Sequence, residues 1–172
     1  MLTRLSHERG QGLIELIVAM VVIAVAVLAL MASYDQAFVS LHKSARTNAA
    51  ATLAETQLEL YGALPYASIG LSSSLVTTAK ASDAFYSTDE AALTPSGTTE
   101  VQPGSCTTTV TQCMPVQPSV TGSDNKQYRV ETFIRDLASG STTERVVTVI
   151  VRDPNTSGTP KVYTATAGFD QG

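Results

Sequence analysis

The sequence contains little of what a catalytic or metal-binding protein needs. It has only two histidines, His7 and His42, and only two cysteines. It contains no HExxH helix, phosphate-binding loop, GxSxG elbow or CxxC pair. A zinc site needs about four ligands held together, and besides the two cysteines the only histidines are His7, in the first ten residues, and His42, far from the cysteines in the sequence. We therefore expect a protein that is not an enzyme and that has no cofactor, metal or small-molecule substrate.

Positive charge is also scarce. The net charge is −4, and the part beyond Pro65 carries seven basic residues against ten acidic ones. A surface that binds phosphate backbones is basic, so this balance argues against a nucleic-acid partner. Four arginines of the last third lie among acidic residues, which favours a solvated sheet face of mixed charge. These are Arg129, Arg135, Arg145 and Arg152.

Proline is absent between Gln11 and Leu64, and this stretch contains a long apolar run. Residues 13–32 number twenty, of which nineteen are apolar. A helix of this length measures about 30 Å, the thickness of the hydrocarbon core of a bilayer. The exception is Glu15, and a carboxylate in lipid costs about 2.5 to 3.5 kcal/mol on insertion scales. We therefore expect a membrane-spanning helix without a proline kink, in which Glu15 has a function.

The first ten residues are polar with a slight positive excess, so we expect them on the cytoplasmic side while the rest of the chain is exported. An ordinary secretory signal is the alternative, with small-residue cleavage sites such as Ala24-Val25-Ala26. The apolar region of such signals usually runs about 7 to 15 residues and contains no acid near its start.

The segment Arg9-Gly10-Gln11-Gly12-Leu13-Ile14-Glu15, followed by a long apolar helix, resembles the N-terminus of type IV pilins and of the related pseudopilins of type II secretion. The resemblance implies that a prepilin peptidase cuts after Gly10 and methylates the new N-terminus at Gln11. It also implies that Glu15 pairs with the terminal amine of a neighbouring subunit in a filament. Most family members have Phe at the position of Gln11, and an N-terminal glutamine can instead cyclise.

The resemblance also implies a function and a location. The chain is expected to be a minor pilin, stored in the inner membrane with its N-terminus inside and then assembled into a cell-surface filament. Its partners would be other pilin subunits, contacted through the N-terminal helix, the prepilin peptidase, the membrane and the inner-membrane assembly machinery. The alternatives are a minor pseudopilin of a type II secretion system, a DNA-uptake pilus subunit and a permanently anchored surface adhesin.

The helical pattern continues beyond the apolar run as an amphipathic stripe. Strong helix formers occupy residues 49–51, 53 and 54, and Gly62 followed by Pro65 supplies a stop. We expect a single helix over residues 13–61. Its expected apolar face consists of Tyr34, Phe38, Leu41, Ala45, Ala49, Leu53, Leu60 and Leu64. Residues 53–60 and 63–66 also resemble minor pilins and minor pseudopilins more than the abundant shaft subunit.

Residues 66–126 are rich in Ser and Thr, which supply 21 of 61 positions. We expect turns and short strands here, anchored to the helix by the apolar pairs Leu75-Val76 and Phe85-Tyr86. Cys106 and Cys113 lie in this region, on the oxidising side of the membrane, and we expect them to form a disulfide. Closing so short a loop would contribute about 2.5 kcal/mol in the chain-entropy model.

The last third alternates apolar and polar residues as a β-sheet does. We expect strands over residues 128–135, 145–152 and 161–167, with turns at 136–143 and 153–160. The expected fold class is α+β and pilin-like: a long N-terminal helix with a membrane-spanning first half, packed against a C-terminal antiparallel sheet. The expected division is a leader at 1–10, a transmembrane or filament-core half at 11–33, an amphipathic half at 34–64 and an exported region at 65–172.

Overall fold

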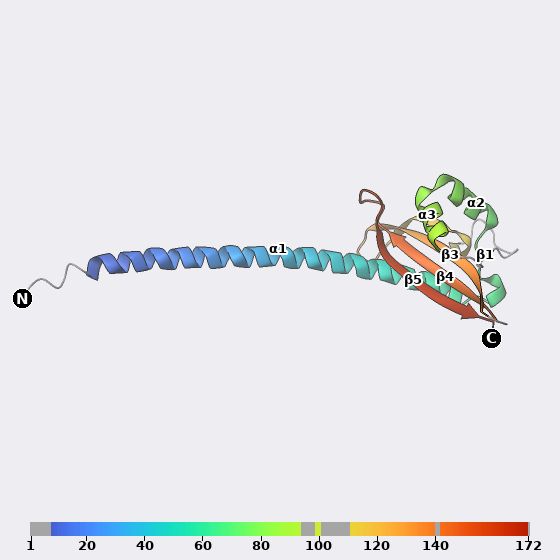
Figure 1. The fold of residues 1–172 in the computed structure, drawn as a ribbon, viewed down its shortest axis with the longest axis horizontal. Helices are drawn as coiled ribbons and strands as arrows, with labels where there is room; N and C mark the ends of the chain where they lie inside the picture. The colour runs from blue at the N-terminus through green and yellow to red at the C-terminus, as the bar shows by residue number, and fades with distance from the viewer. Residues whose placement is uncertain (1–7, 94–98, 101–110, 140–141, 172) are drawn as a thin grey trace, which may run out of the picture. The chain divides into compact units, whose positions relative to one another are not determined.

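The computed structural model describes residues 8–93, 99–100, 111–139 and 142–171 (Figure 1). The chain divides into two compact units, residues 1–44 and residues 45–172, which are treated separately below. The first unit contains the apolar part of helix α1 (Glu8–Gly62). The second contains the end of this helix and a head made of helices and strands.

Helix α1 confirms the expected single helix and its end. After Gly62, the amide of Ala63 donates to the carbonyl of Glu59 at 3.0 Å and that of Leu64 to the carbonyl of Tyr61 at 3.1 Å. Pro65 follows, and proline has no amide hydrogen with which to continue the helix. A short 3-10 turn, η1 (Tyr66–Ser68), then leads away from it.

The head contains an antiparallel sheet in the order β1-β3-β4-β5, with β2 also paired to β3. This confirms the expected meander of three strands. The strands are β1 (Thr99–Glu100), β2 (Val116–Thr121), β3 (Gln127–Ser139), β4 (Thr142–Arg152) and β5 (Lys161–Asp170).

The expected turn at residues 136–143 is wrong in extent, whereas the one at 153–160 is confirmed. Strand β3 continues to Ser139 because residues 136 onward still pair with β4. Asp136 lies directly opposite Arg145, and its Oδ1 accepts a hydrogen bond from Arg145 Nε at 3.0 Å. Opposite charges on facing strands stabilise pairing, and this favours strand over turn.

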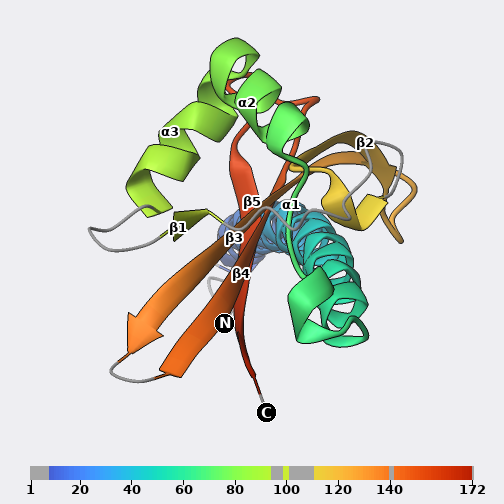
Figure 2. The same ribbon diagram turned by 90° about the vertical axis from the view of Figure 1, so that its right-hand side faces the viewer.

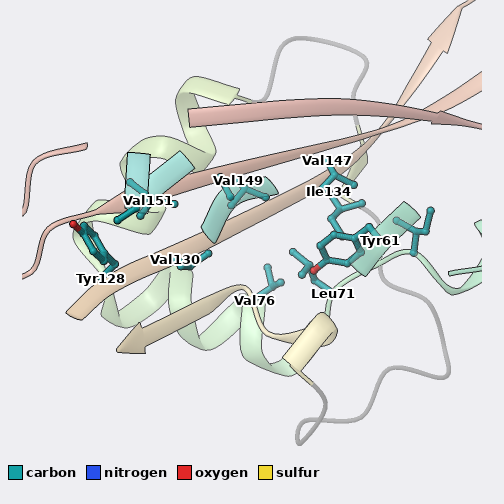
Figure 3. Close-up of a cluster of buried hydrophobic side chains, with 13 residues drawn as sticks. Tyr61, Leu71, Val76, Tyr128, Val130, Ile134, Val147, Val149 and Val151 are labelled. Carbon is teal, nitrogen blue, oxygen red and sulfur yellow. The ribbon is translucent and has the colours of Figure 1, made fainter. Parts of the chain in front are cut away.

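One face of the sheet packs against the end of α1. Ala50, Ala54 and Tyr61 of the helix are fully buried in one cluster with side chains of β3 and β4. Figure 3 shows Tyr61 among these side chains. The core on this face consists of Ala49, Ala50, Ala54, Tyr61, Ile69, Leu71, Val76, Tyr128, Val130, Ile134, Val147, Val149 and Val151.

The expected apolar stripe of the helix is therefore only partly correct. Its early members Tyr34, Phe38 and Leu41 are exposed, and Ala45 is exposed as well. Its later members agree with the prediction: Ala49 is buried, and Leu53 and Leu64 pack against the core. The buried stripe contains smaller and more polar residues than hydrophobicity alone would select, such as Ala50, Ala54 and Gln57.

Two helices cover the opposite face of the sheet, α2 (Ser73–Ser82) and α3 (Ala84–Leu93) (Figure 2). The expectation of turns and short strands over residues 66–126 is wrong for this part. The helices are short and rich in Ser and Thr, so an apolar repeat is hard to see. A local signal exists nonetheless: Asp83 Oδ1 accepts hydrogen bonds from the amides of Phe85 and Tyr86, at 3.0 and 3.1 Å, and so caps α3.

The two apolar pairs of this region lie on different faces. Val76 belongs to the core that includes α1, so the first anchor is confirmed. Tyr86 instead stacks on Phe133 with ring centroids 4.6 Å apart and packs near Ile150 in a second cluster. The second anchor was therefore assigned to the wrong partner, since it attaches to the sheet and not to α1.

Candidate functional site

The predicted cleavage site lies at the beginning of α1. Gly10 and Gln11 belong to the first turn of this helix, and Glu15 follows Gln11 by one turn. The side chain of Gln11 is outside the described residues, whereas Glu15 is exposed. Gly12 has open space around the position of a Cβ atom. Neighbouring molecules can therefore approach this end of the helix closely.

The helix after Glu15 presents apolar side chains in every direction. Each residue from 12 to 45 is exposed, and the large apolar side chains of residues 13–31 are between 44% and 66% exposed. This helix has the length and apolar composition needed to cross a membrane, with a mean hydropathy of 3.1 in its most apolar window. So large an apolar surface requires a cover of lipid or protein.

Glu15 is the only acid within this apolar surface up to residue 34. An ionised carboxylate away from water needs a cationic partner or a set of hydrogen-bond donors. In the chain itself, the only cations near it in sequence are Arg4, Arg9 and, in a processed chain, a new terminal amine. A group of this kind can select one position of a neighbouring helix, because only that position supplies the charge.

The comparisons with known proteins bear on this same segment. The family model described as the prokaryotic N-terminal methylation motif matches residues 5–31. No curated protein and no solved structure matches the chain. The motif confirms the predicted resemblance to type IV pilins and pseudopilins at the N-terminus. The motif, the long apolar helix and the antiparallel sheet together form a pilin-like α+β architecture.

The head carries a second set of charged residues, and here one expectation is wrong. The mixed-charge sheet face was expected to be solvated, but Arg135 and Arg152 are only 6% and 5% exposed, and Arg129 is largely covered. Helices α2 and α3 lie over this face, and Asp83, between the two helices, and Asp89 and Glu90 of α3 supply carboxylates to the arginines. The charges are therefore part of the interior of the head.

Glu131 is at the centre of this buried network. Its side chain is fully buried, and its two oxygens accept hydrogen bonds from two different arginines. Arg129 Nε lies 2.7 Å from Oε1, and Arg152 Nε lies 3.0 Å from Oε2. Arg129 and Arg152 also bind Asp83 and Asp89, and Lys161 Nζ lies 2.7 Å from Asp89 Oδ1. Three cations and three carboxylates thus balance, as burial requires.

The network changes the acidity of its members. Partial burial raises the pKa of Asp83, but hydrogen bonds from Arg129 and from the amides of Tyr86 and Phe85 outweigh burial and lower the pKa below its ordinary value. Burial lowers the pKa of Arg152, but the hydrogen bonds to Glu131 and Asp89 outweigh it and raise the pKa. For both Asp83 and Arg152, the shift in pKa favours the charged form.

The remaining two arginines are also bound within the head. Arg145 donates to the carbonyls of Tyr66 and Ile69, at 2.6 and 2.9 Å, and its guanidinium lies 4.3 Å from the centre of the Tyr66 ring. Arg135 donates to the carbonyl of Glu90 at 3.1 Å. None of the four arginines is thus presented as part of a basic surface.

The helix side of the head contains a polar chain that sequence reasoning missed. Gln117 donates to Gln57 at 3.1 Å, and the hydroxyl of Tyr61 donates to the carbonyl of Gln112 at 2.6 Å. Burial raises the pKa of Tyr61 to about 12. This chain connects α1 to the turn η2 (Thr111–Cys113). Cys113 is buried, but Cys106 lies outside the described residues, so their disulfide stays a prediction.

Sequence reasoning also missed Asp83, Asp89 and Glu131 as a group. One signal was available: Arg129, Glu131 and Arg135 are spaced by even numbers, which places them on one face of a strand. Charged residues along one face of a strand usually indicate that this face is exposed to solvent, whereas here the face is buried. The covering carboxylates come from residues more than 40 positions away, and no local pattern reveals them.

Proposed function

We propose that the chain is a structural subunit of a type IV pilus-like filament, of the minor pilin kind. It is stored in the inner membrane with its N-terminus inside, cleaved after Gly10 by a prepilin peptidase, and methylated at Gln11. It then enters the filament through its N-terminal helix, with the help of the inner-membrane assembly machinery. The observation that carries the proposal is the methylation motif at residues 5–31, together with an apolar helix that is exposed at every residue from 12 to 45.

The proposed mechanism is an exchange of environment for the apolar helix. In the membrane, lipid covers residues 13–32, and in the filament the helices of neighbouring subunits do so. The apolar area removed from water is nearly the same in both states, so burial alone provides little driving force and an ATP-driven machine must supply the work. Glu15 sets the register, because it pairs with the terminal amine of a neighbour.

The head supports a structural role. Its arginines are engaged in internal contacts, and among the described residues of the head the charged clusters pair cations with carboxylates and leave no basic surface patch. A DNA-uptake subunit would need such a patch, and salt-sensitive binding of duplex DNA by the full chain would support that alternative. A pseudopilin of a secretion system differs only in the machinery it serves, and the secreted proteins of a deletion strain separate the two.

The proposal is tested by replacing the acid of the apolar helix. We expect Glu15→Ala to reach the membrane at wild-type levels, since removal of a charge favours insertion. We expect far less of it in sheared filaments, because the register contact is lost. Glu55→Ala, an exposed acid of α1 in the head, is the matched control and should assemble normally. Incorporation of Glu15→Ala at the level of this control would refute the proposal.

A permanently anchored adhesin is the last alternative. Such a protein keeps residues 1–10 and needs no filament, so its Glu15→Ala variant would behave like wild type in every fraction. The same experiment therefore distinguishes an anchor from an assembling subunit, and fractionation into membrane and sheared material gives the readout.

A further inference from the structure

The turn between β4 and β5 is a surface feature of the head to which the proposed function gives no role. It spans residues 153–160 and projects from the end of the sheet at which β5 begins (Figure 1). Its base is closed, because the amide of Asp153 donates to the carbonyl of Pro160 at 3.1 Å. Residues 154–158 form the apex of the turn, and each of them is exposed.

The apex contains the sequence Asn155-Thr156-Ser157. An asparagine followed by any residue except proline and then by Ser or Thr is an acceptor motif for N-linked glycans, and it is used on surface loops of exported proteins. The chain has two other asparagines, Asn48 and Asn125, and neither begins such a motif. The structure therefore places the motif in the surroundings that its chemistry requires.

The turn is held by its backbone and is open to solvent at its side chains. The amide of Asn155 donates to Asp153 Oδ1 at 2.8 Å, and the amide of Thr159 donates to the carbonyl of Thr156 at 2.9 Å. Gly158 has a positive φ of 80°, and a Cβ atom built there would meet no heavy atom within 4 Å. A large substituent on the apex therefore has room.

The two side chains that define the motif are also the ones that the head leaves available. Nδ2 of Asn155 has one long contact, 3.5 Å to the carbonyl of Gln127, which is at the limit for a hydrogen bond. Among the described residues, the hydroxyl of Ser157 has no hydrogen-bond partner. The hydroxyl of Thr156 between them is different, since it donates to Asp153 Oδ2 at 2.9 Å.

We propose that Asn155 carries an N-linked glycan, which an oligosaccharyltransferase attaches on the exported side of the membrane. The donor is an oligosaccharide joined through its anomeric carbon to a lipid diphosphate. The bond from this carbon to the diphosphate oxygen breaks, and a bond to Nδ2 of Asn155 forms. The amide loses one proton to a base, and the lipid diphosphate leaves. The inference rests on the proposed function in one respect, because it requires an exported head.

The head can accept this glycan without losing a stabilising contact. A glycosylated amide keeps one N–H, so Asn155 can still donate to Gln127. The ion pair that ties the turn to α1 joins Asp153 Oδ2 and Arg46 Nη2 at 2.8 Å and does not involve the asparagine. The modification therefore adds a polar surface group to a fixed platform.

Trypsin digestion of the full chain tests the proposal. The chain is isolated from the membranes and from the sheared filaments of its native cells. Cleavage after Arg152 and Lys161 releases residues 153–161 as one peptide that contains the motif. Mass spectrometry with fragmentation that keeps sugars attached is expected to place the added mass on Asn155. A peptide without added mass in both fractions, or with sugar on a hydroxyl group instead, would overturn the inference.

The two neighbouring hydroxyls provide a matched pair of variants. Ser157→Ala destroys the motif and is expected to abolish the glycan, whereas Thr156→Ala and Ser157→Thr keep the motif and are expected to retain it. The mass of the same peptide gives the readout. Retention of the glycan in Ser157→Ala, or its loss in Thr156→Ala, would contradict attachment at Asn155.

The outcome is separate from that of the proposed function. An unmodified peptide from chains that are found in sheared filaments removes the glycan and leaves the filament subunit in place. A glycosylated chain that is absent from sheared filaments would instead support this inference and contradict assembly.

Discussion

Glu131 and Arg152 form a buried ion pair between neighbouring strands, with Oε2 and Nε 3.0 Å apart and the Glu131 side chain at 0% exposure. On the far side of Arg152 lies Asp89 of helix α3, which also pairs with Lys161. The helices that cover this face are thus attached by charge as well as by the apolar cluster around Tyr86 and Phe133. The stability of this interface depends on each charged residue of the network, because a buried charge without its counter-charge destabilises the fold.

The first prediction concerns Glu131. We expect Glu131→Gln to lower the free energy of unfolding by about 3 to 5 kcal/mol, because it leaves two buried arginines without their shared carboxylate. Urea unfolding of the full chain in detergent, followed by the near-ultraviolet circular dichroism of the tyrosines, measures the change. Glu55→Gln, exposed on α1, is the control and should have almost no effect. Equal midpoints for the two variants would contradict the account.

The second prediction concerns Asp83, which caps α3 and binds Arg129. We expect Asp83→Ala to destabilise the head more than Asp83→Asn, since Asn still accepts the capping hydrogen bonds. Loss of the cap costs about 0.5 to 2 kcal/mol. The difference between the two variants appears in their urea midpoints at pH 7, and the reverse order would show that the cap contributes nothing.

The same residue predicts a dependence on pH. The pKa of Asp83 is lowered in the folded head, so its contribution to stability is complete above the unfolded value, about pH 4. It is lost as the pH falls through the lower folded pKa. We expect the wild-type midpoint to fall below about pH 4 more steeply than that of Asp83→Asn. If the midpoints of the two proteins fall equally steeply with pH, Asp83 is not the group responsible for this dependence.

The third prediction concerns Tyr61. We expect Tyr61→Phe to cost about 0.5 to 1.5 kcal/mol, because its hydroxyl donates to the carbonyl of Gln112. Burial raises its pKa to about 12, so the neutral phenol stabilises the head fully below the unfolded value of about 10, and this is lost as the pH rises toward the folded value. Tyr34→Phe, exposed on α1, is the control and should not change the midpoint.

The fourth prediction concerns the cysteines. We expect Cys106 and Cys113 to be joined, so that alkylation of the denatured, non-reduced chain adds no label and prior reduction allows two. Mass spectrometry of the intact protein reads this directly. Two labels without reduction would show that both thiols are free and would contradict the predicted disulfide.

The sequence was sufficient for the parts of the fold that follow a simple period. The uninterrupted helix, its end before Pro65 and the three-stranded meander all carry strong local patterns. The buried face of α1 was only partly predictable, because Ala50 and Ala54 are less hydrophobic than the exposed leucines and valines of the same helix. Which side of the helix is covered depends on the packing of the head.

Helices α2 and α3 and the network beneath them were not predictable in the same way. Each helix has ten residues, and most of its stabilisation comes from contacts with the sheet. Arg129, Glu131 and Arg152 look like solvated residues until Asp83 and Asp89 are placed opposite them. The N-terminal motif, in contrast, could be recognised from the sequence alone, because it consists of a few consecutive residues, from Gly10 to Glu15.

Mass spectrometry of the N-terminus of the mature protein is the most direct test of the central claim. The account predicts a chain that begins at Gln11 and carries one methyl group. A chain beginning at Gln11 without methylation, with its glutamine cyclised, would keep the cleavage but remove the amine that is proposed to pair with Glu15. A mature chain that still begins at Met1, or one cut after Ala26, would contradict the account.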